Sequence, residues 1–186
     1  MPDSFPSLTG QLILDSGQLA GTYFDRSVIL MCAHNAQGAL GLVLNRPTRH
    51  KLSEALRDPP SELFANVPLH LGGPVQTELV SFLLADSTYD GAGVMLASWL
   101  QWCRSFEEAE NGMEANPPLH KLRAFLGYAG WSSGQLEKEL ASGAWIVHPL
   151  EPSLIFPKKP EHVWTEILRS LGGVHRLVVE FPSDPS

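Results

Sequence analysis

The sequence predicts an α+β fold in a single domain over residues 1–186, and three observations lead to this prediction. The chain has 186 residues, which is enough for one domain with a substantial core and too few for two ordinary domains. Its composition, 44% hydrophobic and 18% charged, is typical of soluble globular proteins rather than disordered chains. Pairs of aliphatic segments are interrupted by helical segments, whereas an α/β protein would alternate strands and helices regularly.

The first third of the chain is rich in segments typical of β-strands. Two runs of β-branched and aliphatic residues flank Asn35–Gly38, which predicts two strands joined by a short turn. Pro47 ends the second run, since proline cannot donate a hydrogen bond to a sheet. Pro59 and Pro60 stop a short helix. The elements predicted here are strands over 10–15, 26–34 and 41–45 and a helix over 51–58.

The middle third is predicted to contain another strand pair and a helix. The sequence "GGPV" supplies a turn between two apolar runs. Trp99, Trp102 and Phe106 recur at spacings of three and four, which indicates one face of a helix. The elements predicted here are strands over 67–73, 78–85 and 93–97 and a helix over 98–110.

The last third ends in the most regular helical pattern of the chain. Pro160 stands at its start, glycines stand at its end, and apolar residues follow one side. The predicted elements are strands over 122–130, 144–149, 153–157 and 176–181 and helices over 132–143 and 160–173.

The charge and the cysteines indicate a cytoplasmic protein that does not bind nucleic acid tightly. The net charge is −7, and an acidic surface repels phosphate backbones. The N-terminus, "MPDSFPSLTG", lacks the basic and apolar regions of a secretory signal. Cys32 and Cys103 do not form a C-x-x-C pattern, so both are expected to be reduced and buried.

The pentapeptide Gly130–Gly134 ("GWSSG") matches G-x-S-x-G, the pattern of a hydrolase nucleophile elbow. An α/β-hydrolase order would then need an acid and a histidine in the short segment between Ser132 and the end of the chain. Ser132 and Gln135 also fit a capping box, in which the serine caps the following helix and the glutamine reaches back. The capping interpretation is favoured, and Ser132 is not expected to act as a nucleophile.

Other patterns give weaker signals for chemistry. Cys32 and His34 share one face of a predicted strand, but no histidine or cysteine spacing matches a zinc site. The glycines near residue 130 match neither a dinucleotide-binding loop nor a P-loop. The basic run from Arg46 to Lys51 could bind an acidic ligand or form a solvated turn. The sequence therefore predicts no metal and no cofactor.

Three stretches together resemble the AlgH/YqgE family of bacterial proteins. They are "FDRSVILMCAHNAQGALGLVLNRP", "HLGGPV" and "LGYAGWSSGQLEKELASGAWIVHP", and the match extends from about residue 10 to residue 173. The resemblance implies an α+β fold of mixed, mostly antiparallel sheets flanked by helices. The activity of the family is not established; one member's effect on alginate production gave it the label of transcriptional regulator.

The resemblance also singles out residues. In the family motif the two positions after the tryptophan are variable, and here they hold Ser132 and Ser133, which excludes a family-wide serine hydrolase mechanism. The motif glycines, prolines and tyrosine are Gly38, Gly41, Pro47, Pro74, Gly127, Tyr128 and Gly134. The candidate ligand- or partner-binding residues are Arg26, Ser27, His34, Asn45, Arg46, Gly72, Gly73, Trp131, Gln135 and Glu137, with no catalytic residue and no metal ligand among them.

The chain departs from the family pattern in three places. Ala33 stands where relatives often carry an acidic residue before the histidine. The sequence "LVSF" at 79–82 replaces an R-G-F segment, and residues 179–186 replace a G-H-A ending. A ligand that needs the missing arginine or terminal histidine is not expected to bind this member.

Two functions are compatible with these observations. The first is a non-enzymatic regulatory or binding protein that acts through protein contacts; the chain lacks a helix-turn-helix signature and a basic recognition helix for direct DNA binding. The alternative is a small-molecule binder or enzyme, with Arg26 and Arg46 holding an anionic group and His34 or Glu137 as acid or base. Under a purely structural interpretation, Arg26 and Glu137 would form an ion pair and Trp131 would anchor the core.

Overall fold

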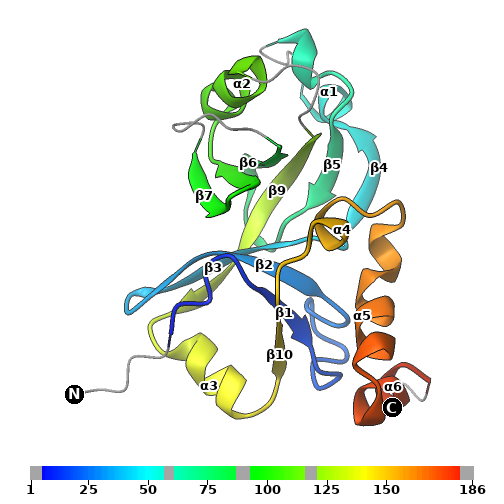
Figure 1. Ribbon diagram of the computed structural model, residues 1–186. Coiled ribbons are helices and arrows are strands. Elements are labelled where there is room, and N and C mark those ends of the chain that lie inside the picture. Colours follow the sequence, from blue (N-terminus) through cyan, green and yellow to red (C-terminus); the bar gives the residue numbers. More distant parts are fainter. Residues whose placement is uncertain (1–5, 57–60, 87–92, 116–120, 181–186) are drawn as a thin grey trace. The chain divides into compact units, whose positions relative to one another are not determined.

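The computed structural model describes residues 6–56, 61–86, 93–115 and 121–180, which divide into two compact units (Figure 1). The terminal unit comprises residues 1–46 and 130–186, and the central unit comprises residues 47–129. Both units combine helices with mostly antiparallel sheet, so the predicted α+β class is confirmed. A single domain over 1–186 stays a prediction.

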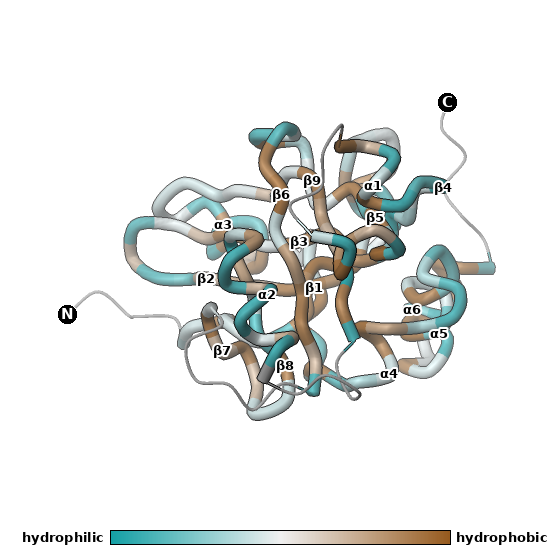
Figure 2. The backbone as a smooth tube through the Cα atoms, turned by 90° about the horizontal axis from the view of Figure 1, so that it is seen from above, coloured by the Kyte–Doolittle hydropathy of each residue, from teal (hydrophilic) through white to brown (hydrophobic). Residues whose placement is uncertain are grey.

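The sheet of the terminal unit has the strand order β10-β1-β2-β3, followed by the end of β9. Its paired neighbours β10–β1, β1–β2 and β2–β3 are antiparallel. Leu12–Leu14 and Val28–Met31 are fully buried, as a continuous apolar run predicts, and Figure 2 shows this run along β1 and β2. The strand bounds are β1 Leu12–Asp15, β2 Val28–Asn35, β3 Gly38–Val43, β9 Lys121–Ser132 and β10 Trp145–His148.

Strands β2 and β3 form the hairpin that the sequence predicts. Asn35 pairs with Gly38 across a two-residue turn, and the Asn35 side chain accepts a hydrogen bond from the Gln37 amide at 2.9 Å. Gly38 has a φ of 140°, and a Cβ there would overlap the carbonyl oxygen of Trp131. Glycine is therefore required where the hairpin meets β9.

The described residues of the terminal unit form four helices: α3 Gln135–Ala141, α4 Pro152–Ile155, α5 Val163–Leu171 and α6 Gly173–Glu180. Helix α5 follows a 3₁₀ turn at Pro160–His162 and confirms the helix predicted over 160–173. The strands predicted over 153–157 and 176–181 are wrong, because residues 153–155 belong to α4 and residues 176–180 belong to α6. In α6, Val174, Leu177 and Val178 follow helical spacing, which the strand preference of β-branched residues concealed.

The central unit has the strand order β4-β5-β9-β6-β8-β7. Strand β9 lies between β5 and β6, parallel to β5 and antiparallel to β6. The predicted strand pair around "GGPV" therefore exists as two strands, but they do not pair with each other. The bounds are β4 Pro47–Lys51, β5 Pro68–Leu71, β6 Val75–Ala85, β7 Val94–Ala97 and β8 Leu100–Cys103.

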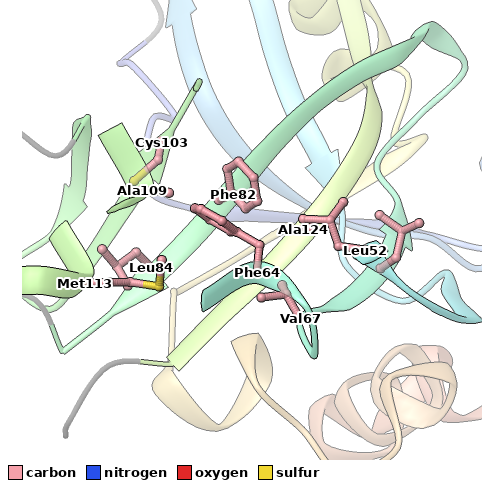
Figure 3. Packing of buried hydrophobic residues seen from close by; sticks show 10 residues of the cluster. Leu52, Phe64, Val67, Phe82, Leu84, Cys103, Ala109, Met113 and Ala124 are labelled. Carbon is pink, nitrogen blue, oxygen red and sulfur yellow. The ribbon is translucent and has the colours of Figure 1, made fainter. Parts of the chain in front are cut away.

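The central unit has a core of its own, to which three helical elements among the described residues contribute side chains (Figure 3). The rings of Phe64, Phe82 and Phe106 contact one another with centroid distances of 4.9 to 5.4 Å. The helical elements are α1 Leu52–Ala55, a 3₁₀ turn at Glu62–Phe64 and α2 Phe106–Ala115. Helix α1 ends before the predicted residue 58; residues 57–60 lie outside the described ranges.

The helix predicted over 98–110 is half wrong. Residues 100–103 form β8, which pairs with β6, and α2 begins at Phe106. Pairing with the buried end of β6 overrides the local helical spacing of the aromatic residues. Among the described residues, no helix combines the length and apolar composition that crossing a membrane requires.

Candidate functional site

The structure separates the candidate residues into three groups. The first group surrounds the loop that precedes β2, the second surrounds the start of α3, and the third lies in the central unit. Arg26, Ser27, Asn45 and Arg46 form the first, His34, Trp131, Gln135 and Glu137 the second, and Gly72 and Gly73 the third.

A buried carboxylate organises the first group. Asp15 is completely buried, and its Oδ1 accepts hydrogen bonds from the amides of Gly17 and Leu19 at 2.8 and 3.1 Å. Its Oδ2 accepts from the amide of Arg26 at 2.8 Å. Asn45 completes this arrangement, accepting from the Val28 amide at 2.9 Å and donating to the Arg26 carbonyl at 2.8 Å. Asn45 is therefore a fixed structural link rather than a residue poised to orient a ligand.

The first group contains two guanidinium groups, that of Arg26 on the loop before β2 and that of Arg46 between β3 and β4. Arg26 has a φ of 54°, a left-handed conformation uncommon outside glycine, and its guanidinium carbon lies 5.6 Å from the ring centroid of Trp164. Arg46 donates to the Asp25 carbonyl. Burial raises the pKa of Tyr23, and the positive charge of Arg46 opposes that rise. Ser27 is buried, and its hydroxyl has no hydrogen-bond partner among the described residues.

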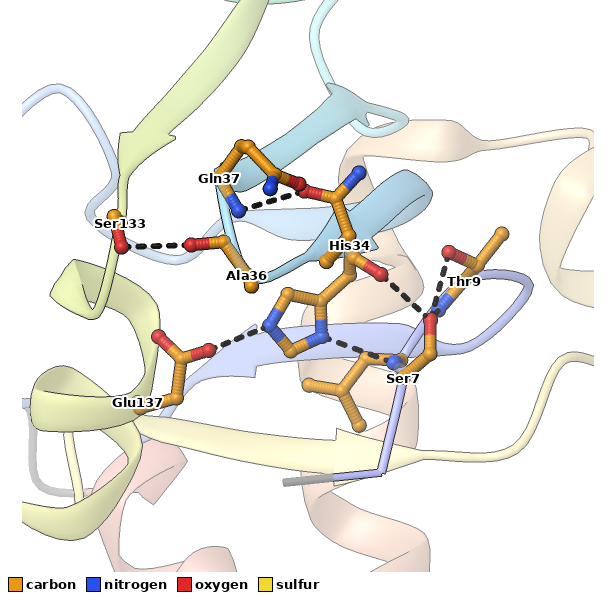
Figure 4. Close-up of polar contacts among 9 residues, drawn as sticks. Ser7, Thr9, His34, Ala36, Gln37, Ser133 and Glu137 are labelled. Carbon is orange, nitrogen blue, oxygen red and sulfur yellow. Dashed lines mark hydrogen bonds and ion pairs between the residues drawn. The ribbon is translucent and has the colours of Figure 1, made fainter. Parts of the chain in front are cut away.

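His34 is the centre of the second group (Figure 4). Its Nδ1 accepts a hydrogen bond from the Leu8 amide at 3.0 Å, and its Nε2 lies 2.9 Å from Glu137 Oε1. Because a backbone N–H can only donate, the network assigns the proton of the neutral ring to Nε2, which donates to Glu137. The imidazole is 3% exposed and the Glu137 side chain 21%. The hydrogen bond from His34 is the main cause that lowers the pKa of Glu137.

A second carboxylate, Glu139, holds two tryptophans of the same group. Its Oε2 accepts from the indole Nε1 of Trp131 at 2.8 Å and of Trp145 at 2.7 Å. Its Oε1 accepts from Gln135 Nε2 at 3.0 Å. The two indole centroids are 6.0 Å apart, and Phe24 stacks on Trp131 at 6.3 Å. Trp131 is thus a buried anchor, as the structural interpretation of the sequence expects.

Ser132 does not cap α3. It is the last residue of β9, and Gly134 stands at the N-cap with a φ of 74°. The amide and the hydroxyl of Ser132 both donate to Gln135 Oε1, at 3.1 and 3.3 Å. Half of the predicted capping box is present, because the Gln135 side chain accepts a hydrogen bond from the Ser132 amide. The other half is absent, because the Ser132 hydroxyl donates to the Gln135 side chain instead of accepting from a backbone amide of the helix. An amide oxygen cannot accept the hydroxyl proton as a catalytic base would.

The first two groups do not share a pocket. Arg26 precedes β2 and His34 stands near its end, so eight residues of extended chain separate them by roughly 25 Å. The structural interpretation that paired Arg26 with Glu137 is also wrong, because Glu137 binds His34. The two arginines and the His34–Glu137 pair therefore do not lie together in one site.

The two glycines of the third group serve the sheet of the central unit. The Gly72 amide donates to the Leu126 carbonyl at 2.7 Å. A Cβ on Gly73 would overlap the backbone of Tyr128. This close approach explains why the turn after β5 carries glycine.

Within the basic run from Arg46 to Lys51, residues Pro47–Lys51 form strand β4 at the edge of the central sheet. Among the described residues β4 pairs with β5 alone, and Arg49, His50 and Lys51 are exposed. His50 bonds Glu54 at 3.1 Å, and Lys51 bonds Asn66 at 2.8 Å. Charged side chains on an edge strand discourage pairing with another chain, which accounts for this cluster without a ligand.

The thiols and the remaining acidic and histidine residues form no reactive cluster in the described ranges. No group of three or more His, Cys, Asp or Glu side chains there could hold a metal ion. Cys32 and Cys103 are buried, and neither forms a disulfide bond among the described residues. Burial raises the pKa of both thiols, for Cys103 to about 12. Cys32 Sγ faces the Leu30 carbonyl at 3.7 Å rather than His34, so the two do not form a nucleophilic pair.

Sequence reasoning missed four residues that shape the site: Asp15, Glu139, Trp145 and Trp164. Glu139 follows Gln135 by one helical turn, a spacing that could have suggested their contact. Trp164 donates its indole N–H to the Asp15 carbonyl at 2.8 Å across 149 positions of sequence. No local pattern signals a contact of that range.

Known proteins match this chain over nearly its whole length. A family model described as "DUF179: AlgH-like" matches residues 12–176. A UPF0301 protein of Chlorobium luteolum is 39% identical over 182 residues, which covers 95% of this chain and 92% of the relative. A UPF0301 protein of Cytophaga hutchinsonii is 35% identical over 178 residues, which covers 95% of this chain and 96% of the relative.

Two solved structures have a similar fold. The solution structure of the AlgH protein from Pseudomonas aeruginosa has a TM-score of 0.70 at 30% identity and covers 100% of both chains. A crystal structure of a protein from Corynebacterium diphtheriae has a TM-score of 0.73 at 23% identity, covering 99% of this chain and 95% of that one. The second likeness concerns the fold alone.

Proposed function

The chain belongs to the AlgH-like family, DUF179, and we propose that it is a non-enzymatic regulatory protein of the cytoplasm that acts by binding another protein. The names of its relatives, UPF0301 protein and AlgH, state no activity. The proposal therefore rests on the side chains of this chain and on its surface.

The exposed apolar side of α6 is the observation that carries the proposal. Val174 and Leu177 on α6 are 70% and 53% exposed, and Leu171 at the end of α5 is 42% exposed. No residue of α6 is buried, whereas α5 buries four. Apolar residues that follow helical spacing normally face a core or a partner, so their exposure on α6 favours a protein contact.

The state of the polar candidates gives further support. His34, Asn45 and Gln135 use their polar side-chain atoms in hydrogen bonds within the terminal unit. A catalytic group needs a lone pair or a proton that can reach the substrate. Side chains that hold the fold together are better suited to a binding protein.

In-cell photo-crosslinking tests the proposal. A photoreactive amino acid at position 174 should give a discrete crosslinked product in bacterial cells that make the chain. The same amino acid at exposed position 161 serves as the matched control. Leu177→Glu should remove the product without changing the circular dichroism spectrum, because the side chain is exposed. Equal products from both positions would contradict a protein contact at α6.

A second candidate function is binding of a small anion by Arg26 and Arg46. Arg26 lies on the loop before β2, and Arg46, between β3 and β4, donates to the Asp25 carbonyl of that loop. A guanidinium group retains further donors after one hydrogen bond. Inorganic phosphate and dicarboxylates should then raise the melting temperature of the wild-type protein in proportion to ligand binding. Arg46→Met should lose this ligand-dependent shift, and Arg49→Met, on the edge strand, should keep it. No shift with the wild type would rule out anion binding.

A further inference from the structure

The N-terminal segment Ser7–Gln11 lies along β2 and is held there at two points. At one point the Gly10 amide donates to the Met31 carbonyl at 2.8 Å, and the Met31 amide donates to the Gln11 carbonyl at 2.9 Å. At the other, the Ser7 hydroxyl donates to the His34 carbonyl at 2.9 Å, and the Leu8 amide donates to His34 Nδ1. Leu8 is buried. The second point depends on a side chain that can change its charge.

The Leu8–His34 hydrogen bond requires the neutral imidazole. A protonated ring donates from both nitrogens, so Nδ1–H would face the Leu8 N–H across 3.0 Å. The bond would be lost and two donors would oppose each other in a buried site. At the other nitrogen the change has the opposite sign, because Nε2–H would then face the Glu137 carboxylate as a charged donor. Protonation thus weakens one contact of the ring and strengthens the other.

Among the described residues, one charged group contacts the ring. Glu137 on α3 supplies the carboxylate, and its lowered pKa keeps it ionised under mildly acidic conditions. Its neighbour Glu139 binds the two indoles instead. Strand β3 presents Ala39 opposite His34, and the segment Ser7–Gln11 has no ionisable side chain.

We infer that Ser7–Leu8 is a pH-sensitive latch, held on β2 while His34 is neutral and released when His34 is protonated; the backbone bonds of Gly10 and Gln11 to Met31 remain. Release leaves the His34–Glu137 contact in place and exposes the end of β2 next to His34. The device is independent of the surface of α6 and of the proposed protein contact there, so either can fail without the other.

Hydrogen exchange of the full-length protein tests the latch. The exchange of the Leu8 amide is followed from about pH 8 to about pH 5. After correction for the intrinsic exchange rate, the protection of the Leu8 amide should fall at least about tenfold across this range, while amides of α5 keep theirs. An equal loss of protection in α5 would mean global unfolding and would overturn the proposal.

Two variants locate the effect. His34→Gln replaces the ring by an amide that can accept from Leu8 and donate to Glu137 without titrating, so protection of Leu8 should become independent of pH. His50→Gln, at the exposed histidine of β4, is the matched control and should keep the wild-type pH dependence. Unchanged pH dependence in His34→Gln would overturn the latch.

A measurement on the wild type covers the case in which His34→Gln does not fold. The ¹⁵N shifts of the His34 ring at neutral pH should be those of the tautomer protonated at Nε2. On acidification they should move to the doubly protonated form over the same range in which Leu8 loses protection. A ring protonated at Nδ1 at neutral pH, or a ring that titrates apart from the Leu8 change, would contradict the inference.

Discussion

His70 is a buried imidazole in β5, and it shows how strongly one side chain can couple stability to pH. It is 2% exposed, and neither ring nitrogen has a partner of ordinary hydrogen-bond geometry in the described part of the chain. Its ring lies 5.3 Å from that of Phe125. Burial lowers the pKa of His70 to about 4, and the positive charge of Arg123 acts in the same direction.

The first prediction concerns acid stability. The unfolded chain protonates His70 below its ordinary pKa of about 6.5, and the folded chain only near 4. The unfolded state therefore binds more protons between these values, and the free energy of unfolding falls as pH drops through this window. Between about pH 7.5 and pH 4.5, the free energy of unfolding measured in urea titrations should fall by roughly 2–3 kcal/mol less for His70→Leu than for the wild type.

The exposed His50 provides the control for this experiment. His50→Leu should leave the acid-induced loss of stability close to that of the wild type. If His70→Leu lost as much stability in acid as His50→Leu does, the buried ring would not be responsible.

At the same scale, the sequence identifies residues better than it identifies their partners. Its motifs mark His34 and Glu137 as candidates but do not predict that the two bind each other across 103 positions. They do not mark Asp15 at all, although three backbone amides bind its carboxylate. Side-chain partners this far apart in sequence depend on strand pairing over long separations, which residue type and spacing do not reveal.

Glu139 links three elements, because α3 carries the carboxylate, β9 carries Trp131 and β10 carries Trp145. The second prediction is that Glu139→Ala destabilises the protein by about 2–4 kcal/mol, since two buried indole N–H groups lose their acceptor. Urea unfolding monitored by tryptophan fluorescence measures this. Lys138→Ala, at the neighbouring position of the same helix, should change stability by less than about 0.5 kcal/mol. Similar values for both variants would show that the link contributes little.

The turn after β5 gives the third prediction, because Gly73 lies against the backbone of Tyr128 in β9. Gly73→Ala should cost roughly 3 kcal/mol or more, since rigid backbone cannot move aside without disturbing the strand. Gly21→Ala is the control: Gly21 has a φ of 78°, and a Cβ added there would have no atom within 4 Å. It should cost about 1 kcal/mol from its backbone conformation alone. Thermal unfolding of both variants separates the two contributions, and equal losses would refute the packing explanation.

Element prediction succeeds where a segment's own pattern decides its structure. The buried runs of β1 and β2 and the amphipathic α5 are predicted correctly from apolar periodicity. The errors in β8, α4 and α6 arise where the local pattern conflicts with the structure. In β8, pairing with β6 decides the outcome, whereas in α6 the β-branched residues suggest a strand that the chain does not form.

For the whole molecule, the two buried thiols report on the two units separately. Cys32 lies in the terminal unit and Cys103 in the central unit. The fourth prediction is that both react with a thiol reagent at the same urea concentration, because β9 contributes residues to both units and its loss would disrupt both sheets. Cys32→Ser and Cys103→Ser, each with one remaining thiol, give the two transitions. A lower midpoint for either thiol would show that its unit opens alone.

The place of β9 in the chain also fixes the order in which a growing polypeptide can fold. Strands β5 and β6 leave the ribosome well before β9, which has to enter between them. The terminal unit waits longer still, because β1 needs β10 beside it. The nascent protein therefore carries apolar strands with unsatisfied edges for most of its synthesis, so its yield in cells should depend on chaperones that bind the emerging chain.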